Sequence, residues 1–85
     1  MGPAKTTVTI YSAPWCVYCR MAKEYLDSKG VAFKDVDIER QQAAAMYIMS
    51  KTGRAGVPVI EIGDSFILGF DRPRIDTALL DHKLV

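Results

Sequence analysis

The chain is poor in metal-ligating residues and has no long apolar stretch. Its 85 residues include two cysteines and one histidine, whereas a zinc site typically takes four Cys or His ligands, so one chain cannot complete such a site. The longest apolar run, residues 43–49, is far shorter than the roughly 18 residues that span a bilayer, which excludes a transmembrane helix. Neither sign of charge dominates, because 11 Lys and Arg are interleaved with 10 Asp and Glu. A nucleic-acid-binding domain normally carries a basic stripe, so we do not expect a nucleic acid as partner. The short apolar run likewise argues against a membrane as partner.

What the chain does have is enough apolar residues for one small domain. Hydrophobic residues make up 49% of it, and a compact chain of this length has a radius of gyration of about 12 Å. We expect a flexible N-terminus over residues 1–5 and one folded domain over residues 6–85. Because the N-terminus lacks the apolar core of a secretory signal, we expect a cytoplasmic protein. Structural disulfides are rare there, so the two cysteines need another explanation.

Strand-like and helix-like segments alternate along the chain. Alternating polar and apolar residues predict strands, and apolar residues at helical spacing predict helices. Strands are expected at residues 7–10, 32–37, 59–62 and 65–68, and helices at residues 17–29, at residues 39–52 and after Asp71. A strand–helix–strand start implies a right-handed crossover between parallel strands, while the later hairpin is antiparallel. The expected fold is an α/β sandwich of order βαβαββα, with a four-stranded mixed sheet flanked by three helices.

Local signals mark the ends of these elements. Gly30 and Gly53 stand where the first two helices stop, and residues 63–64 favour the positive φ of a hairpin turn. Asp71 can accept the first free N–H groups of the last helix, with Pro73 in its first turn. The buried stripes are expected to hold Ala22, Tyr25 and Leu26 in the first helix, Ala43, Met46, Tyr47 and Ser50 in the second, and Ile75, Ala78 and Leu79 in the third.

Cys16 and Cys19 lie between the first strand and the first helix. A helix begins with unpaired N–H groups and the positive end of its dipole, and both favour a thiolate at Cys16. The nearby charges act in the same direction, since Arg20 and Lys23 precede the first acidic residue, Glu24. The three-residue spacing lets Cys19, one helical turn on, reach the Cys16 sulfur and form a small-ring disulfide.

Three other uses of the cysteine pair have less support. A stapling disulfide that closes so small a ring adds little stability. A covalent haem needs a histidine directly after the second cysteine, where Arg20 stands. A metal cluster shared between two chains stays open as an alternative, because Cys16, Cys19 and the remote His82 supply too few ligands within one chain.

Three motifs in order resemble the glutaredoxin and thioredoxin superfamily. They are Cys16-Val17-Tyr18-Cys19 after a strand, Val57-Pro58 opening a later strand, and Gly69-Phe70-Asp71 opening the last helix. The resemblance covers nearly the whole domain, and it is greatest to short glutaredoxin-like redoxins, including those that reduce ribonucleotide reductase. It implies a thioredoxin-like fold of the glutaredoxin type, in which Cys16 attacks a substrate disulfide and Cys19 resolves the mixed disulfide.

Val57-Pro58 resembles the cis-proline element of this family. A cis bond there would turn the main-chain groups of Val57 toward the cysteines, ready to pair with an extended substrate. The alternative is a trans Pro58 that only starts an edge strand. The resemblance thus makes both residues candidates for substrate binding.

The chain departs from typical glutaredoxins around the cysteines. Those proteins carry a proline after the first cysteine and a Lys or Arg three residues before it, where this chain has Val17 and Ala13. Residues 13–16 instead resemble the thioredoxin approach to the active site, which makes Trp15 a candidate substrate platform. The alternative for Trp15 is a packed core residue. Tyr18 is a further candidate to flank the substrate, or an exposed packing residue.

The last motif bears on glutathione. The glutathione site of glutaredoxins ends in two glycines followed by an acidic residue, where this chain has Gly69, Phe70 and Asp71. Asp71 is a candidate both to cap the helix and to bind the glutathione amino group. Phe70 fills the space that the second glycine would leave open, so we expect weak glutathione binding.

The function implied by the resemblance is that of a dithiol–disulfide oxidoreductase in electron transport and cell redox homeostasis, with no bound cofactor. Its electrons would come from NADPH through thioredoxin reductase or, as the alternative donor, from glutathione. The apolar residues around the cysteines suggest a disulfide-containing protein as substrate, and we expect a monomer. The alternative function is an iron–sulfur cluster carrier, in which two protomers hold the cluster through Cys16 and glutathione.

Overall fold

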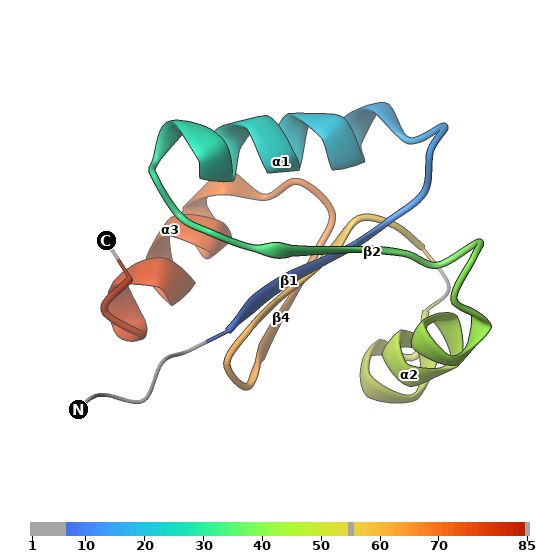
Figure 1. Cartoon of the computed structure of the whole chain (residues 1–85). Helices are drawn as coiled ribbons and strands as arrows, with labels where there is room; N and C mark the ends of the chain where they lie inside the picture. Colours follow the sequence, from blue (N-terminus) through green and yellow to red (C-terminus); the bar gives the residue numbers. More distant parts are fainter. Residues whose placement is uncertain (1–6, 55, 85) are drawn as a thin grey trace.

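The structure, a computed structural model, describes residues 7–54 and 56–84, so the N-terminus expected to be flexible lies outside the described residues. Within them, strands and helices follow one another in the predicted order (Figure 1). The strands are β1 (Val8–Ser12), β2 (Lys34–Asp37), β3 (Val59–Ile62) and β4 (Ser65–Leu68), and the helices are α1 (Val17–Ser28), α2 (Gln42–Thr52) and α3 (Arg72–Asp81). The Cα radius of gyration, 12.2 Å, is that of a compact domain of this length.

The strands form one mixed sheet in the order β2-β1-β3-β4. β1 and β2 run parallel, with Ile10 opposite Asp35, and α1 forms the crossover between them. β3 runs antiparallel to β1, with Ile60 opposite Ile10, and makes the antiparallel hairpin with β4. The predicted fold is therefore confirmed.

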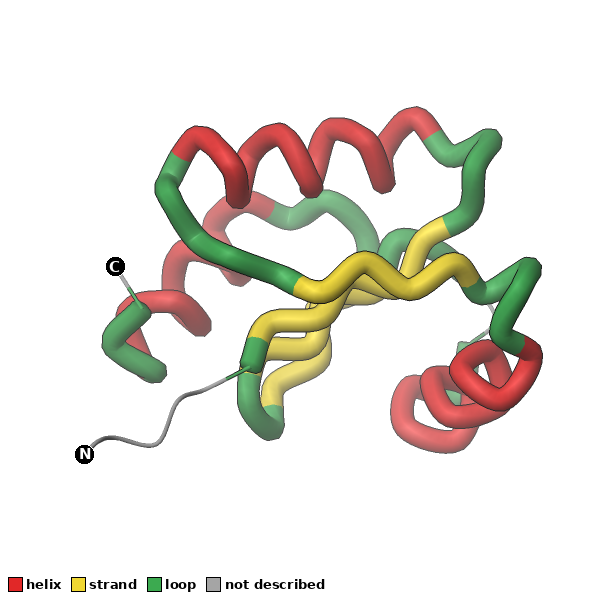
Figure 2. The backbone as a smooth tube through the Cα atoms, in the orientation of Figure 1, coloured by secondary structure: helices red, strands yellow, loops and turns green. Residues whose placement is uncertain are grey.

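Helices cover both faces of the sheet. α1 and α3 lie on one face and α2 lies on the other (Figures 1 and 2). Successive residues of a strand point to opposite faces, so Ile10 of β1 packs under α1 and α3 while Tyr11 packs under α2. The cluster under α1 and α3 consists of Val8, Ile10, Ala22, Leu26, Val31, Ile60, Ile62, Ile67, Ile75, Ala78 and Leu79. The cluster under α2 consists of Tyr11, Val36, Ile48 and Val59.

The second helix differs from its prediction in two ways. α2 begins at Gln42 rather than at residue 39, because residues 38–40 form a turn after β2. Its buried residue is Ile48, whereas Met46 is 68% exposed. The other residues of the predicted stripe are also exposed: Ala43, Tyr47 and Ser50. The prediction is wrong because the alanine- and methionine-rich sequence has no strongly polar face that would fix the rotation of the helix.

Two further predictions need correction, because β2 begins at Lys34 rather than at residue 32 and Tyr25 of the predicted α1 stripe is only partly buried. The buried residues of α3 are the predicted Ile75, Ala78 and Leu79. Gly63, at the β3–β4 turn, has a φ of +60°, and a Cβ there would lie 2.6 Å from Cε1 of His82. The positive φ therefore favours glycine at this turn, and a larger residue would also displace the His82 ring. In the described part of the chain, no helix is both long and apolar enough to cross a membrane.

Candidate active site

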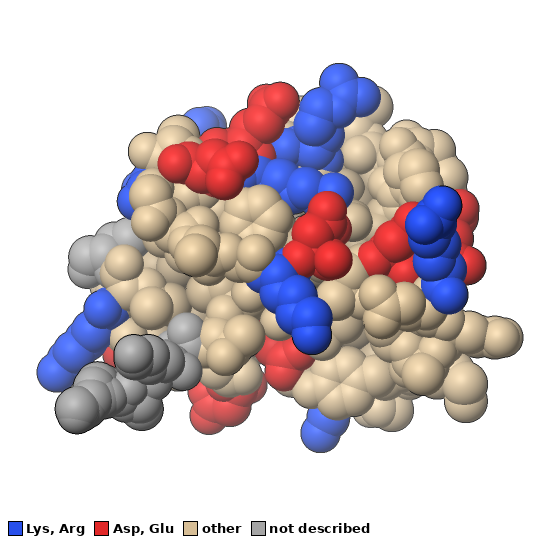
Figure 3. All heavy atoms as spheres, viewed as in Figure 1, with Lys and Arg blue, Asp and Glu red and all other residues tan. Residues whose placement is uncertain are grey.

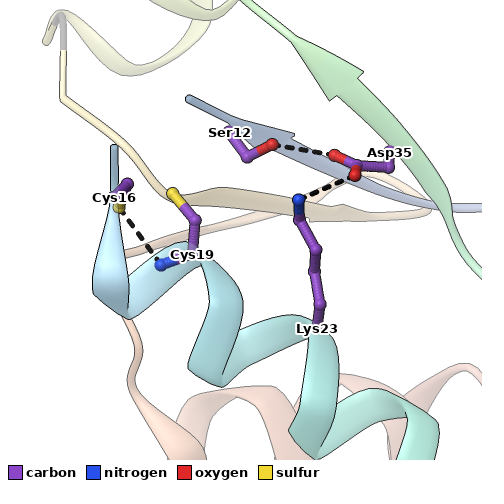
Figure 4. Close-up of polar contacts among 5 residues, drawn as sticks. All are labelled: Ser12, Cys16, Cys19, Lys23 and Asp35. Atoms are coloured by element: carbon purple, nitrogen blue, oxygen red, sulfur yellow. Dashed lines mark hydrogen bonds and ion pairs between the residues drawn. The ribbon is translucent and has the colours of Figure 1, made fainter. Parts of the chain in front are cut away.

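Cys16 occupies the N-cap position of α1. β1 ends at Ser12, and the Cys16 N–H donates to the Ala13 carbonyl (3.1 Å), which closes the turn that leads into the helix. The backbone of Cys16 is extended (φ −89°, ψ 111°), as is usual for an N-cap residue. Its Sγ accepts a hydrogen bond from the Cys19 N–H at 3.1 Å (Figure 4). The sulfur thus takes the place that a serine or aspartate oxygen fills in an ordinary N-cap.

The start of α1 presents a backbone N–H group to this sulfur. The first N–H groups of a helix have no partners within the helix, and one of them, that of Cys19, points at Sγ. No acidic residue lies in the first turn of α1 to oppose a negative charge. The local geometry therefore suits Cys16 as the attacking sulfur.

The two cysteines, both free, differ in their surroundings. Cys16 is 9% exposed to solvent, and Cys19 is 1% exposed. Ala13 and Val57 pack against them to form a small apolar cluster. Burial, followed by the contact with the Cys16 sulfur, raises the pKa of the Cys19 thiol. Cys16 is therefore the more accessible of the two cysteines.

Large apolar side chains surround the cysteines without being buried. Trp15 is 67% exposed, Val17 58% and Tyr18 63%. The alternative of a core tryptophan is therefore wrong. The indole N–H of Trp15 donates to the carboxylate of Glu39, in the turn after β2. Sequence analysis did not single out Glu39, because nothing local relates it to a tryptophan 24 residues earlier.

The proline element lies next to the cysteines. The Val57–Pro58 peptide bond is cis, as predicted. Val57 packs against the cysteine cluster, and the Gly69 N–H donates to the Pro58 carbonyl (2.9 Å), which joins the start of β3 to the end of β4. These three residues line a groove together with three that sequence analysis did not single out: Arg54, Gly56 and Leu68.

The two residues after Gly69 support the helices. Asp71 is the N-cap of α3, as predicted: its Oδ1 accepts the Arg74 N–H at 3.2 Å and its Oδ2 lies 3.5 Å from Arg74 Nε. The Phe70 ring packs edge-on against Tyr25 of α1, with 5.8 Å between ring centroids. The space that Phe70 fills therefore lies against α1.

Two residues that the sequence did not indicate, Ser12 and Asp35, join Lys23 in a polar group beside Cys19. Ser12 of β1, Lys23 of α1 and Asp35 of β2 are joined by polar contacts next to the cysteines (Figure 4). The sequence does show that Lys23 follows Cys19 by four residues and so shares its side of the helix. It does not show the strand register that places Asp35 beside Ser12.

Charge and metal ligands are distributed as in many small domains. On the face shown in Figure 3, Lys and Arg side chains lie beside Asp and Glu side chains. Within residues 7–54 and 56–84, no three His, Cys, Asp or Glu side chains come together as a group that could hold a metal ion.

Comparison with known proteins gives the same result. The glutaredoxin family model matches residues 8–67, which include both cysteines and Pro58. An uncharacterised glutaredoxin-like 8.6 kDa protein in the rubredoxin operon of Clostridium pasteurianum is 39% identical over 69 residues, covering 81% of this chain and 92% of that protein. Glutaredoxin 3 of Escherichia coli is 39% identical over 64 residues, which cover 75% of this chain and 77% of that protein.

The solved structures agree. The glutaredoxin-like protein NrdH-redoxin from Escherichia coli, described as having a thioredoxin-like activity profile, superposes with a TM-score of 0.77 at 28% identity, covering 84% of this chain and 92% of that one. This chain thus shares its fold with a glutaredoxin-like redox protein. The chain belongs to the glutaredoxin family, whose members carry out thiol–disulfide redox chemistry.

Proposed function

We propose that this glutaredoxin-family protein reduces disulfides of a protein substrate by a dithiol mechanism. The Cys16 thiolate attacks one substrate sulfur, the substrate disulfide breaks, and the second substrate sulfur leaves as a thiolate that takes up a proton. Cys19 then loses its proton and attacks the Cys16 sulfur. This step breaks the mixed disulfide and releases the first substrate sulfur. The substrate gains two electrons, and the protein is left with a Cys16–Cys19 disulfide.

The observation that carries the proposal is the 3.1 Å hydrogen bond from the Cys19 N–H to Cys16 Sγ. It puts the attacking sulfur at a helix N-terminus and brings the backbone of the resolving cysteine against it. The burial of Cys19 supports its later role, since an intramolecular attack needs no access from solvent.

The substrate we propose is a protein rather than a charged small molecule. Trp15, Val17 and Tyr18 together expose an apolar surface around Cys16, and exposed aromatic side chains are typical of protein-binding sites. We place Trp15 and Tyr18 at the sides of the bound substrate, and the main chain of Val57, next to Pro58, along it. Gly69, Phe70 and Asp71 would border the substrate where β4 ends.

For the electron donor we propose thioredoxin reductase with NADPH, and only a weak reaction with glutathione. Support comes from the likeness to NrdH-redoxin, with its thioredoxin-like activity profile. The sequence also lacks the second glycine of the Gly-Gly step, where Phe70 stands. The protein would act as a cytoplasmic monomer without a bound cofactor.

The test follows NADPH consumption during reduction of insulin, with either thioredoxin reductase or glutathione and its reductase as donor. We expect turnover with thioredoxin reductase and at least about tenfold less with glutathione. Cys16→Ser abolishes turnover. Cys19→Ser stops after one step and accumulates a mixed disulfide with the substrate, visible as added mass.

Two results would overturn the proposal. Full turnover of Cys19→Ser would show that one thiol suffices, as in the alternative of a cluster carrier that uses Cys16 and glutathione. Such a carrier would also bind iron and sulfide with a brown colour. Absence of turnover with either donor would exclude the proposed reductase activity.

A further inference from the structure

Lys23 is held in place near the resolving cysteine by a residue from the sheet. Its Nζ lies 2.7 Å from Oδ2 of Asp35. The other carboxylate oxygen, Oδ1, accepts a hydrogen bond from Ser12 Oγ at 2.8 Å. Figure 4 shows the three side chains meeting on the side of α1 that faces the sheet, next to Cys19. Both oxygens of Asp35 are thus engaged, which fixes the direction of its ion pair with Lys23.

Burial and fold both favour this arrangement. Ser12 is 3% exposed, and the side chains of Lys23 and Asp35 are 29% and 46% exposed. Parallel pairing places Ile10 opposite Asp35 and Ser12 opposite Asp37. Ser12 is therefore two residues along β1 from the partner of Asp35, on the same face of the sheet, and the two side chains meet diagonally. Lys23 follows Cys19 by one turn of α1, which puts both side chains on the same side of the helix. The network therefore ties α1 to β1 and β2 at the cysteines.

The resolving step is the one that such a cation can help. Cys19 has to attack as a thiolate, yet burial and the Cys16 sulfur raise the pKa of its thiol. The hydrogen bond with the backbone of Ala13 and, to a smaller extent, the charge of Lys23 lower this pKa. Of the charged side chains around this sulfur, Lys23 is the one that stabilises its anion.

We propose that Lys23, held by Asp35 and Ser12, stabilises the developing Cys19 thiolate during resolution of the mixed disulfide. This inference rests on the proposed dithiol function. The proton of Cys19 goes to solvent, and the sulfur attacks Cys16 Sγ and forms the intramolecular disulfide. The bond between Cys16 and the substrate sulfur breaks, and that sulfur takes up a proton. Lys23 stays protonated throughout, and Asp35 and Ser12 are positioning residues that act through it.

The test separates attack from resolution in one experiment. Reduced protein is mixed rapidly with one equivalent of dithiodipyridine, an uncharged disulfide that releases one coloured thione when Cys16 attacks and a second when Cys19 resolves. The first phase depends on reagent concentration and the second does not. Lys23→Met keeps most of the side-chain length and removes the charge, while Lys23→Arg restores the charge.

We expect Lys23→Met to slow the second phase about three- to tenfold and to leave the first phase within about twofold. Loss of a nearby cation raises a thiol pKa by about 1–2 units. Each unit of higher pKa lowers the thiolate fraction about tenfold. The more basic thiolate is about threefold more nucleophilic, so the attack rate falls about threefold per unit. Lys23→Arg should keep a second phase within about twofold of the wild type. The matched control is Lys29→Met, because Lys29 also lies in the α1 region and pairs with a carboxylate, that of Asp76 at 3.5 Å, but at the far end of the helix.

The outcomes are distinct. A second phase that is unchanged in Lys23→Met, or slowed as much in Lys23→Arg or Lys29→Met, would overturn the inference. An equal slowing of both phases would show that Lys23 only supports the fold, and would overturn it as well. Failure of the proposed function looks different, because the wild-type protein itself would then release no second equivalent.

Discussion

Among residues 7–54 and 56–84, the face of the sheet under α1 and α3 holds eleven buried apolar residues in one cluster, whereas the face under α2 holds four. On the α2 face, hydrogen bonds add to the apolar packing. The hydroxyl groups of Tyr11 and Tyr47 donate to the two carboxylate oxygens of Glu61, at 2.7 and 2.8 Å. Both cysteines belong to the start of α1, which is anchored in the larger cluster through Ala22 and Leu26. The helix that begins at the two cysteines thus packs on the face of the sheet with the larger cluster.

The largest expected effect is that of truncating the core under α1. Leu26 is fully buried, so Leu26→Ala removes its packing and leaves a cavity. We expect the free energy of unfolding to fall by about 3–5 kcal/mol, at the upper end for such substitutions. Urea unfolding followed by circular dichroism measures it. A loss below that of Ile48→Ala under α2 would reverse the comparison of the two faces.

On α2, one residue should carry most of the packing. Ile48 is 1% exposed and Met46 is 68% exposed. We expect Ile48→Ala to cost about 2 kcal/mol and Met46→Ala to change the free energy of unfolding by less than about 0.5 kcal/mol. The same urea titration compares them. Equal costs would mean that the helix is rotated toward the stripe predicted from the sequence.

The smallest effect concerns the polar contacts under α2 at alkaline pH. Burial, followed by the hydrogen bond to Glu61, raises the pKa of Tyr11 above its ordinary value. Above about pH 10 the unfolded chain then binds fewer protons than the folded one at this residue, so the stability that Tyr11 contributes is present below pH 10 and lost as pH rises. Between pH 10 and 11 the wild type should lose about 1 kcal/mol more than Tyr11→Phe. Parallel losses in the two proteins would show that Tyr11 ionises as easily in the folded state.

The contrast between the two faces of the sheet also shows how much of the fold could be predicted from the sequence. The polar–apolar alternation of β1, the turn at Gly63, the helix cap at Asp71 and the apolar spacing of α3 are local signals, and they were sufficient for the fold. The rotation of α2 was mispredicted because Ile48 is its single buried residue amid alanines and methionines. Tertiary packing alone selects it.

At the candidate site the limit is similar. The positions of Cys16 and Cys19 at the start of a helix follow from their spacing and from the strand before them. The contacts of Glu39 with Trp15 and of Asp35 with Lys23 join segments that only the parallel pairing of β1 and β2 brings together. Such contacts depend on register, which a single sequence does not specify.

Partial alkylation of the reduced wild-type protein tests most directly whether Cys16 attacks and Cys19 resolves. Iodoacetamide is added at neutral pH for short times, and peptide mass spectrometry reads the fraction modified at each cysteine. Because Cys19 is 1% exposed and its pKa is raised, Cys16 should be modified at least about tenfold faster. Equal rates, or faster modification of Cys19, would contradict the assignment of Cys16 as the attacking sulfur.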